Sequence, residues 1–352
     1  MEAIIHSYLN IFPTFGLVFT ICVMLYTLSK GADLLVDEAV KLSLRWGVSK
    51  MIIGATIVSL GTTLPEASVS VLAAINGIPD LALGNAIGSI IADTGLIIGI
   101  AAILGHLPVD KVVVERQGKI QVWAGMLLAF VCLPFLSGGK GNISQWIGWL
   151  FLALLVGYIY TSIKWSKNPI SHGSQEGKES LYTENEAAIT EEVLDQEKNS
   201  ILIQMLKLFF GIFLVIGSSK ILIPAVEISA IRVGIPQSII AATLIAFGTS
   251  LPELVTAITA VRKGHGELAI GNIVGADILN VLFVVGSAAA VTSGGLDVPL
   301  NFYKLQIPTM VIILITFRLF SRGKNNEEIT KKEGIVLLSM YLIYLILNYT
   351  WI

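Results

Sequence analysis

The sequence predicts an all-α polytopic membrane protein of ten transmembrane helices, arranged as two inverted five-helix repeats with broken helices at the membrane midplane. Three observations predict this fold: an apolar composition, ten apolar segments of spanning length, and a duplicated polar motif. The chain of 352 residues is 54% hydrophobic and only 14% charged, whereas soluble domains carry about 25% charged residues. A surface with so little charge is expected to face lipid.

A spanning helix needs about 20 mostly apolar residues to cross about 30 Å of hydrocarbon. We expect ten such helices at residues 12–44, 49–76, 80–104, 118–137, 143–165, 200–231, 235–262, 266–291, 302–320 and 333–351. The first and the sixth segments are long and end amphipathically, which favours tilted or bent helices.

Lysine and arginine residues concentrate in alternate loops. One group of loops carries Lys41, Arg45, Lys50, Lys111, Arg116, Lys119, Lys164, Lys167, Arg262, Lys263, Arg318, Arg322, Lys324, Lys331 and Lys332. The opposite short loops hold almost only Lys140. Because positively charged loops stay in the cytoplasm, we expect a multi-pass protein of the cytoplasmic membrane with both termini outside.

Residues 166–199 differ from the rest of the chain. They are rich in acidic residues and contain almost no apolar clusters, a composition typical of flexible segments. We interpret them as a cytoplasmic acidic linker between a first five-helix repeat at 1–165 and a second, inverted five-helix repeat at 200–352.

The two halves share a motif. GATIVSLGTTLPE at 54–66 and AATLIAFGTSLPE at 241–253 are identical at seven of thirteen positions. GNAIGSIIADTGLIIG at 84–99 matches GNIVGADILNVLFVVG at 271–286 with the same offset, since 253 − 66 and 271 − 84 both equal 187. Duplication of an odd number of spans inverts the second half in the membrane, and inverted repeats are typical of secondary transporters.

Each copy of the first motif places a proline inside a spanning segment. Pro65 has no N–H to donate within a helix, so we expect the carbonyls of Ser59–Thr62 to lose hydrogen bonds. Pro252 is expected to act in the same way on Ala246–Thr249. Lipid offers these carbonyls no partner, whereas a dehydrated cation is a suitable one.

Glu66 and Glu253 follow the two prolines directly. An ionised carboxylate at mid-bilayer costs several kcal/mol, so each is expected to face a cavity and bind a cation. Thr62 and Thr249 stand one helical turn earlier and are expected to face these carboxylates. The next hydroxyl residues are Thr63 and Ser250.

The second motif adds Asp93 in the first half and Asn280 at the equivalent position of the second. Ser89 lies one turn before Asp93, so both can point at the first break. All these candidate ligands are oxygens, which suits hard cations, Ca²⁺ above all, and does not suit zinc or copper. Three Na⁺ ions would balance Glu66, Asp93 and Glu253, whereas one Ca²⁺ would balance two of them.

With these residues the chain resembles the cation/calcium exchanger superfamily and, more narrowly, the prokaryotic sodium/calcium exchangers. The resemblance rests on GTTLPE with GNAIGSIIAD and on GTSLPE with GNIVGADILN. It implies a ten-helix fold with a cluster of cation sites near the midplane. It also implies alternating access through sliding of the first and sixth helices, with several Na⁺ ions entering for each Ca²⁺ expelled.

The resemblance further implies a set of ligands. The implied calcium ligands are Glu66, Glu253, Thr62 and Thr249. The implied sodium ligands add the carbonyls of Ser59 and Ala246 and the side chains of Thr63, Ser250 and Ser89, and the central polar pair is Asp93 and Asn280.

The chain departs from the family pattern at three points. Ala276 stands where the family commonly has Ser, and Asp277 stands where Asn is usual. Asp277 either compensates from the adjacent face or alters ion choice or coupling. The acidic and amide members of the Asp93–Asn280 pair are also exchanged between the repeats.

The leading hypothesis is a Na⁺/Ca²⁺ antiporter that works by alternating access. The alternatives are a divalent cation exchanger coupled to H⁺ or K⁺ and, in a different class, a cation channel. Gly88 and Gly275 occupy the positions where proton-coupled relatives carry Glu, which argues against that route of proton coupling. We expect no enzymatic activity, no cofactor and, at a net charge of −2, no nucleic-acid partner. The expected partners are Ca²⁺, Na⁺ and the lipid bilayer, with the chain working as a monomer.

Overall fold

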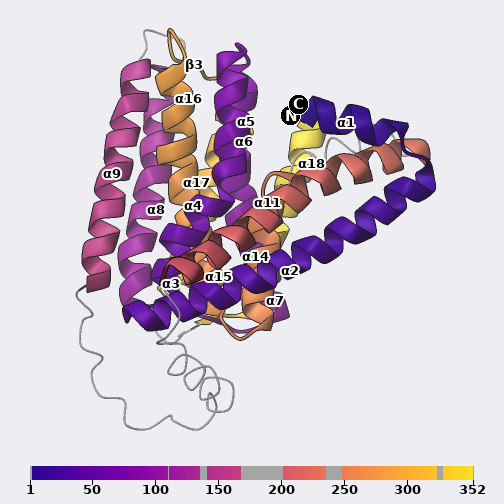
Figure 1. The fold of residues 1–352 in the computed structure, drawn as a ribbon. Coiled ribbons are helices and arrows are strands. Elements are labelled where there is room, and N and C mark those ends of the chain that lie inside the picture. The colour runs from indigo at the N-terminus through magenta and orange to yellow at the C-terminus, as the bar shows by residue number, and fades with distance from the viewer. Residues whose placement is uncertain are drawn as a thin grey trace.

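The computed structural model describes residues 2–109, 111–134, 141–167, 201–234, 248–322 and 328–351, and these residues are mostly helical (Figure 1). Within them, six helices are long and apolar enough to cross a membrane, or seven if one bent pair counts as a single span. The prediction of a multi-pass helical membrane protein is therefore confirmed. Ten spans and the inversion of the repeats stay predictions.

The first half contains α1 (Glu2–Ile11), α2 (Thr14–Trp46), α3 (Lys50–Ile53), the π-helix η1 (Gly54–Val58), α4 (Ser59–Thr62), α5 (Leu64–Ile75), α6 (Pro79–Ile91), the π-helix η2 (Ala92–Ile97), α7 (Ile98–Leu104), β1 (Leu107–Pro108), α8 (Lys111–Val131), β2 (Asn142–Ile143) and α9 (Gln145–Lys167). The second half contains α11 (Ile201–Arg232), α14 (Leu251–Arg262), α15 (Gly266–Leu279), the π-helix η6 (Asn280–Val285), α16 (Gly286–Val291), β3 (Leu296–Asp297), the π-helix η7 (Phe302–Gln306), α17 (Ile307–Phe320), β4 (Glu328–Ile329) and α18 (Lys331–Trp351).

The helices α2 and α11 lie side by side and run obliquely past the more upright helices (Figure 1). Two glycines permit their close approach. A Cβ on Gly31 would lie 2.8 Å from the Cβ of Leu214, and a Cβ on Gly211 would lie 2.8 Å from the backbone nitrogen of Leu35. Small residues serve this purpose in membrane helix pairs generally, so α2 and α11 form one tightly packed unit.

Two short antiparallel strand pairs connect the halves. Leu107–Pro108 pairs with Glu328–Ile329, and Asn142–Ile143 pairs with Leu296–Asp297. The first pair joins loops that were predicted to share the basic side, and the second joins loops predicted to share the opposite side. Which end faces the cytoplasm stays a prediction.

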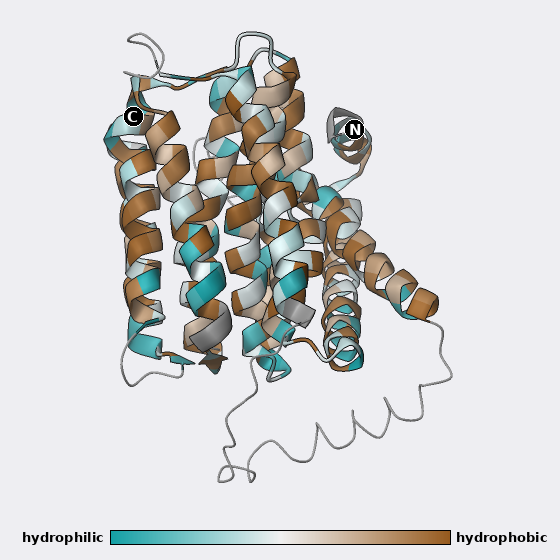
Figure 2. Ribbon diagram, turned by 90° about the vertical axis from the view of Figure 1, so that its left-hand side faces the viewer, coloured by the Kyte–Doolittle hydropathy of each residue, from teal (hydrophilic) through white to brown (hydrophobic). Residues whose placement is uncertain are grey.

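Many large apolar side chains are exposed on the helices, whose ribbons are largely coloured as hydrophobic (Figure 2). Phe213 on α11 is 68% exposed, and Trp146 on α9 is 83% exposed. By contrast, α15 and α16 form the innermost span, with 94% of its most apolar stretch buried. An exterior this apolar is unfavourable in water and favourable in lipid. The span that carries the second motif lies at the centre of the bundle.

Some predicted boundaries shift in the structure. The fourth span was expected at 118–137, but α8 begins at Lys111 and ends at Val131. Its early turns are polar, and Glu115 there pairs with Lys119 at 2.7 Å and with Arg318 at 2.6 Å. These ion pairs allow the helix to begin before the apolar run. The linker predicted at 166–199 lies almost wholly outside the described residues, although α9 continues to Lys167.

Candidate cation-binding site

The first motif forms a bent helix. The segment Lys50–Thr62 and the segment Leu64–Ile75 meet at an angle of 43° around Thr63. Pro65 stands at the second position of α5, where a missing N–H is tolerated. The helix therefore breaks at the predicted place and resumes with its N-terminus, the positive end of its dipole, beside Glu66.

One expectation about this break is wrong. The carbonyl of Ser59 was predicted to lose its hydrogen bond, but it accepts one from the N–H of Thr63 at 2.9 Å. Proline removes only the donor to the residue four positions earlier, and for Pro65 that residue is Gly61. Ser59 itself is fully buried, and its carbonyl keeps a second lone pair.

Glu66 points into the protein. It is 1% exposed, and neither carboxylate oxygen has a hydrogen-bond partner among the described residues. Thr63, at the bend, is fully buried with an unpaired hydroxyl oxygen. Burying an ionised carboxylate without partners costs several kcal/mol of free energy. This carboxylate is therefore a candidate cation ligand.

The second motif is described only from Gly248 onwards, because 235–247 lie outside the described residues, and Ala246 falls there. Pro252 and Glu253 occupy the first turn of α14, as Pro65 and Glu66 do in α5. Glu253 is 1% exposed. It lies close enough to Glu66 for the two carboxylates to repel each other electrostatically, so the structure brings the two predicted glutamates together.

The threonines of the two motifs reach across to the other half. The Thr62 hydroxyl lies 3.3 Å from Asn272 Oδ1 and within hydrogen-bonding reach of Glu253. The Thr249 hydroxyl donates to Asn85 Oδ1 at 3.2 Å. We expected each threonine to face the glutamate of its own motif, and for Thr62 the observed contact is with the opposite glutamate. The bend at Thr63 accounts for this difference, because it separates the faces of α4 and α5.

Asn85 and Asn272 each contact a threonine of the other half. Asn85 Nδ2 donates to the Glu66 carbonyl at 3.2 Å and to Ser70 Oγ at 3.0 Å. Asn272 is fully buried, and its Nδ2 has no partner among the described residues. These amides therefore hold the threonine hydroxyls in place from the facing half.

Asp93 joins the two glutamates. It is 1% exposed, and it lies within reach of the Ser250 hydroxyl and in electrostatic range of Glu66 and Glu253. Ser89, one turn earlier on α6, is also buried. Asp93 and Asn280 both stand at the start of π-helices, η2 and η6, an irregularity that is frequent at functional sites.

Asp277 lies on the far side of Asp93 and interacts with it electrostatically. Its Oδ2 accepts hydrogen bonds from the Thr94 hydroxyl at 2.5 Å and from Gln121 Nε2 at 2.6 Å. Neither Thr94 nor Gln121 was predicted as a site residue. In the sequence, Gln121 stands out only as an amide within the otherwise apolar part of α8. The sequence of this helix alone does not show which residue is its partner.

Most of the buried polar atoms without a partner belong to the residues of this candidate site. Among the described residues, the buried side-chain atoms without a hydrogen-bond partner are Thr63 Oγ1, both Glu66 oxygens, Asp93 Oδ1, Gln117 Oε1, Gln121 Oε1, Glu253 Oε2, Thr256 Oγ1, Asn272 Nδ2, Asp277 Oδ1, Asn280 Oδ1 and Gln306 Oε1. All but one are oxygens. Buried polar atoms normally have partners, and acceptors that no protein donor satisfies are the ligands that hard cations prefer.

This chemistry differs from a dedicated cluster of ionisable ligands. Within the described part of the chain, no three His, Cys, Asp or Glu side chains are grouped tightly enough to hold one metal ion. A cation here would therefore use two carboxylates together with hydroxyl, amide and backbone oxygens, and this ligand set stays a prediction.

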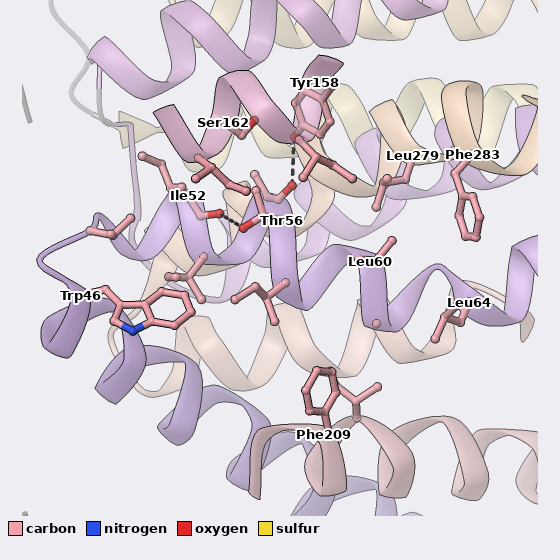
Figure 3. Close-up of a pocket in the computed structure, with 18 of the residues that line it drawn as sticks. Trp46, Ile52, Thr56, Leu60, Leu64, Tyr158, Ser162, Phe209, Leu279 and Phe283 are labelled. Atoms are coloured by element: carbon pink, nitrogen blue, oxygen red, sulfur yellow. Dashed lines mark hydrogen bonds between the residues drawn. The ribbon is translucent and has the colours of Figure 1, made fainter. Parts of the chain in front are cut away.

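An apolar pocket of about 900 Å³ lies on the other side of the bent helix (Figure 3). Its lining includes Leu60 and Leu64 from the first motif and Phe209 from α11. Tyr158 and Ala55 also line it, and the Tyr158 hydroxyl donates a hydrogen bond to the Ala55 carbonyl at 2.9 Å. None of the residues that line this pocket carries a charge, so it is not the cation site, although it shares a wall with it.

The model of the sodium/calcium exchanger protein family matches residues 16–164 and 203–350. The chain belongs to this exchanger family. The predicted resemblance is thereby confirmed, and the two matched segments correspond to the two halves on either side of the predicted linker.

Individual family members match over nearly the whole chain. The inner membrane protein YrbG of Escherichia coli is 31% identical over 319 residues, which are 91% of this chain and 92% of that protein. The sodium/calcium exchanger MaX1 of Methanosarcina acetivorans is 30% identical, with 91% and 94% covered. A structure of the sodium-calcium exchanger NCX_Mj soaked with Na⁺ and Ca²⁺ matches with a TM-score of 0.73 and 25% identity over 93% of this chain and 96% of that one.

Proposed function

We propose that this exchanger is a secondary antiporter that moves Na⁺ against Ca²⁺ by alternating access across the cytoplasmic membrane. The observation that carries the proposal is the meeting of Glu66 and Glu253 at the two helix breaks, buried and with carboxylate oxygens that no described donor satisfies. Two carboxylates balance the charge of one Ca²⁺. Relatives named as sodium/calcium exchangers support the choice of ions.

The proposal includes ten spans in two inverted repeats. Two contacts support the inversion. Thr62 of the first half meets Asn272 of the second, and Thr249 of the second meets Asn85 of the first. In sequence these four residues are equivalent pairwise, since 249 − 62 and 272 − 85 both equal 187. A twofold relation between the halves would generate such reciprocal contacts.

The proposed calcium ligands are the carboxylates of Glu66 and Glu253 with the hydroxyls of Thr62 and Thr249. The proposed sodium ligands are Thr63, Ser250, Ser89 and the carbonyls of Ser59 and Ala246, with Asp93 and Asn280 at the centre. Because both ions would share these carboxylates, Na⁺ binding displaces Ca²⁺, and this competition is the physical basis of exchange.

The site changes its exposure by movement of α2 and α11. These two helices pack against each other through Gly31 and Gly211. The helix α2 is joined to Lys263, which follows α14, by ion pairs with Asp33 at 3.3 Å and with Asp37 at 2.8 Å. Partly exposed ion pairs contribute only about 0–1 kcal/mol, so the pair can move relative to the core at little cost.

The test is radioactive Ca²⁺ uptake into proteoliposomes loaded with Na⁺, with K⁺ or with an acidic buffer, at a clamped membrane potential. We expect uptake that depends on an outward Na⁺ gradient and saturates with Ca²⁺. Uptake driven by the K⁺ or proton gradient alone would contradict Na⁺ coupling and favour the K⁺- or H⁺-coupled alternative. Flux that rises linearly without saturation would identify a channel.

A further inference from the structure

Asp277 is a fourth buried carboxylate at the site. It is 2% exposed, and it lies in electrostatic range of Asp93. The groups that act on Asp277 from neighbouring elements are the donors Thr94 and Gln121 and the carboxylate of Asp93. No lysine or arginine of the described residues forms an ion pair with it. Its charge is therefore not balanced by a cationic side chain of the described residues.

The hydrogen bonds of Asp277 do not explain its charge. Thr94 and Gln121 both donate to Oδ2. An asparagine, the residue usual at this position in the family, could accept the same two hydrogen bonds at its amide oxygen without burying a charge. An aspartate is more costly to bury than an asparagine, so a purely structural role would favour the amide.

Three unpaired oxygens belong to this carboxylate and to the two residues Asp93 and Gln121 that interact with it. Asp277 Oδ1 has no partner among the described residues, nor does Asp93 Oδ1. Gln121 is 1% exposed, and its Oε1 is likewise unpaired. Because the nitrogen of that amide contacts Asp277, its oxygen stands within a few ångström of the same carboxylate. The three oxygens come from η2, α8 and α15.

We infer that Asp277, Asp93 and Gln121 bind one Na⁺ ion beside the ions proposed for Glu66 and Glu253. This inference rests on the proposed function and adds one Na⁺ to each transport cycle. A monovalent ion fits better than Ca²⁺, which takes about six to eight oxygen ligands, and Asp93 already shares its charge with the central site. The carboxylate of Asp277 adds one negative charge to those of Glu66, Glu253 and Asp93, and one additional Na⁺ balances it.

The test measures the number of Na⁺ ions exchanged for one Ca²⁺. At zero membrane potential, net flux stops when the Ca²⁺ ratio across the vesicle equals the Na⁺ ratio raised to that number. Full-length protein and the Asp277→Asn variant are compared in proteoliposomes with the potential clamped and the pH equal on both sides. In a tenfold Na⁺ gradient, losing one Na⁺ lowers the equilibrium Ca²⁺ ratio about tenfold, and we expect this result for Asp277→Asn.

The matched control is Thr94→Val. It removes one hydrogen bond to Asp277 and keeps the carboxylate and the unpaired oxygens. We expect a slower rate with the wild-type equilibrium ratio. If both variants shift the ratio equally, or if neither does, Asp277 has only a structural role and the inference is overturned.

A second readout does not require transport. Na⁺ stabilises the folded protein by mass action, so the dependence of the unfolding temperature on Na⁺ concentration reports the number of ions bound. Asp277→Asn should lower that dependence by the contribution of one ion. Should the variant fail to fold, Gln121→Leu replaces it, with an expected severalfold weaker apparent Na⁺ affinity and an unchanged Ca²⁺ affinity; an unchanged Na⁺ affinity would overturn the inference.

Two outcomes separate this inference from the proposed function. If the wild-type protein shows no Na⁺-driven Ca²⁺ flux, the proposed function fails whatever Asp277 does. If the wild type exchanges Na⁺ for Ca²⁺ but Asp277→Asn keeps the same ratio and the same Na⁺ dependence, only the additional site fails. If the two proteins differ only when a pH gradient is imposed, the bound ion is a proton and the assignment of Na⁺ is wrong.

Discussion

The two halves of the site are alike in their glutamates and differ in the residues that surround them. Glu66 and Glu253 each follow a proline in the first turn of a helix. In the first half, Asn85 is held by Ser70 and by the Glu66 carbonyl. In the second half, Asn272 Nδ2 has no described partner, and Ala257 stands where Ser70 does, since 257 − 70 equals 187.

The difference separates the residues that would bind a cation in both halves from those that occur in one half alone. The glutamates, the threonines and the asparagines recur in both halves, as a site on a shared axis requires. The acid at Asp93 and the acid at Asp277 have no acidic counterpart at Asn280 and Ile90. The charge is therefore distributed unevenly, with both unmatched acids on the side near η2 and α8.

The largest effect is expected from the residues that the halves share. Glu66→Gln and Glu253→Gln each remove half of the charge that balances Ca²⁺ while keeping the side-chain volume, so each should lower Na⁺-driven Ca²⁺ uptake at least about 100-fold. Elution as a folded monodisperse species checks the fold. Asp80→Asn, an exposed acid at the start of α6, is the control and should transport normally. Exchange retained in either glutamine variant would remove this assignment.

The next effect concerns the exchanged pair. Asp93→Asn should reduce exchange about tenfold or more, because it removes a buried acid near both glutamates. Adding Asn280→Asp returns an acid to the equivalent position of the other half. If the halves are equivalent around the central site, this double variant should recover most of the flux. No recovery would show that the acid is needed on the Asp93 side, and initial rates of Ca²⁺ uptake distinguish the two results.

A smaller effect should test the reciprocal contacts. Thr62→Val and Thr249→Val each remove one hydroxyl and keep the shape of the side chain. A lost hydrogen bond of this kind corresponds to about 1.4 kcal/mol, or a tenfold weaker apparent Ca²⁺ affinity. Equal losses would support the twofold relation. If Thr62→Val weakens the apparent Ca²⁺ affinity much more than Thr249→Val does, the contact of Thr62 with Glu253 has no equivalent in the other half.

The smallest effect is expected away from the ion. Ser70→Ala leaves Asn85 and the Ala82 carbonyl each without one hydrogen bond, so it should cost about 1 kcal/mol of stability. Ala257→Ser adds a hydroxyl at the position equivalent to Ser70, where it is expected to reach the unpaired Asn272 amide, and should change stability little or raise it. Thermal unfolding of both variants measures this. Equal destabilisation by both would contradict the contrast between the halves.

Much of this site could be predicted from the sequence. The duplicated motifs identified Glu66, Glu253 and Asp93 because a bilayer makes carboxylates costly wherever they have no role. The break next to Pro65 followed from the missing N–H. These inferences depend on local chemistry, which a sequence carries in full.

Contacts between distant segments could not be predicted. Thr62 meets Glu253 rather than Glu66 because a bend of 43° turns α5 away from α4, and no spacing rule contains that angle. Gln121 looked like an isolated amide in α8 until the packing of η2 and α15 placed Thr94 and Asp277 beside it. The rotation introduced by a π-helix is likewise invisible in a pattern of one-turn spacings.

The two strand pairs have a mechanical consequence. β1 with β4 and β2 with β3 stitch connecting loops of one half to those of the other, at two places along the bundle. These links are expected to hinder the upright helices of the two halves from moving apart. The helices α2 and α11 cross these upright helices. The helix α2 is joined to Lys263, which follows α14, by ion pairs that are partly exposed and therefore weak. Under the proposed alternating access, α2 and α11 are therefore the helices that we expect to move.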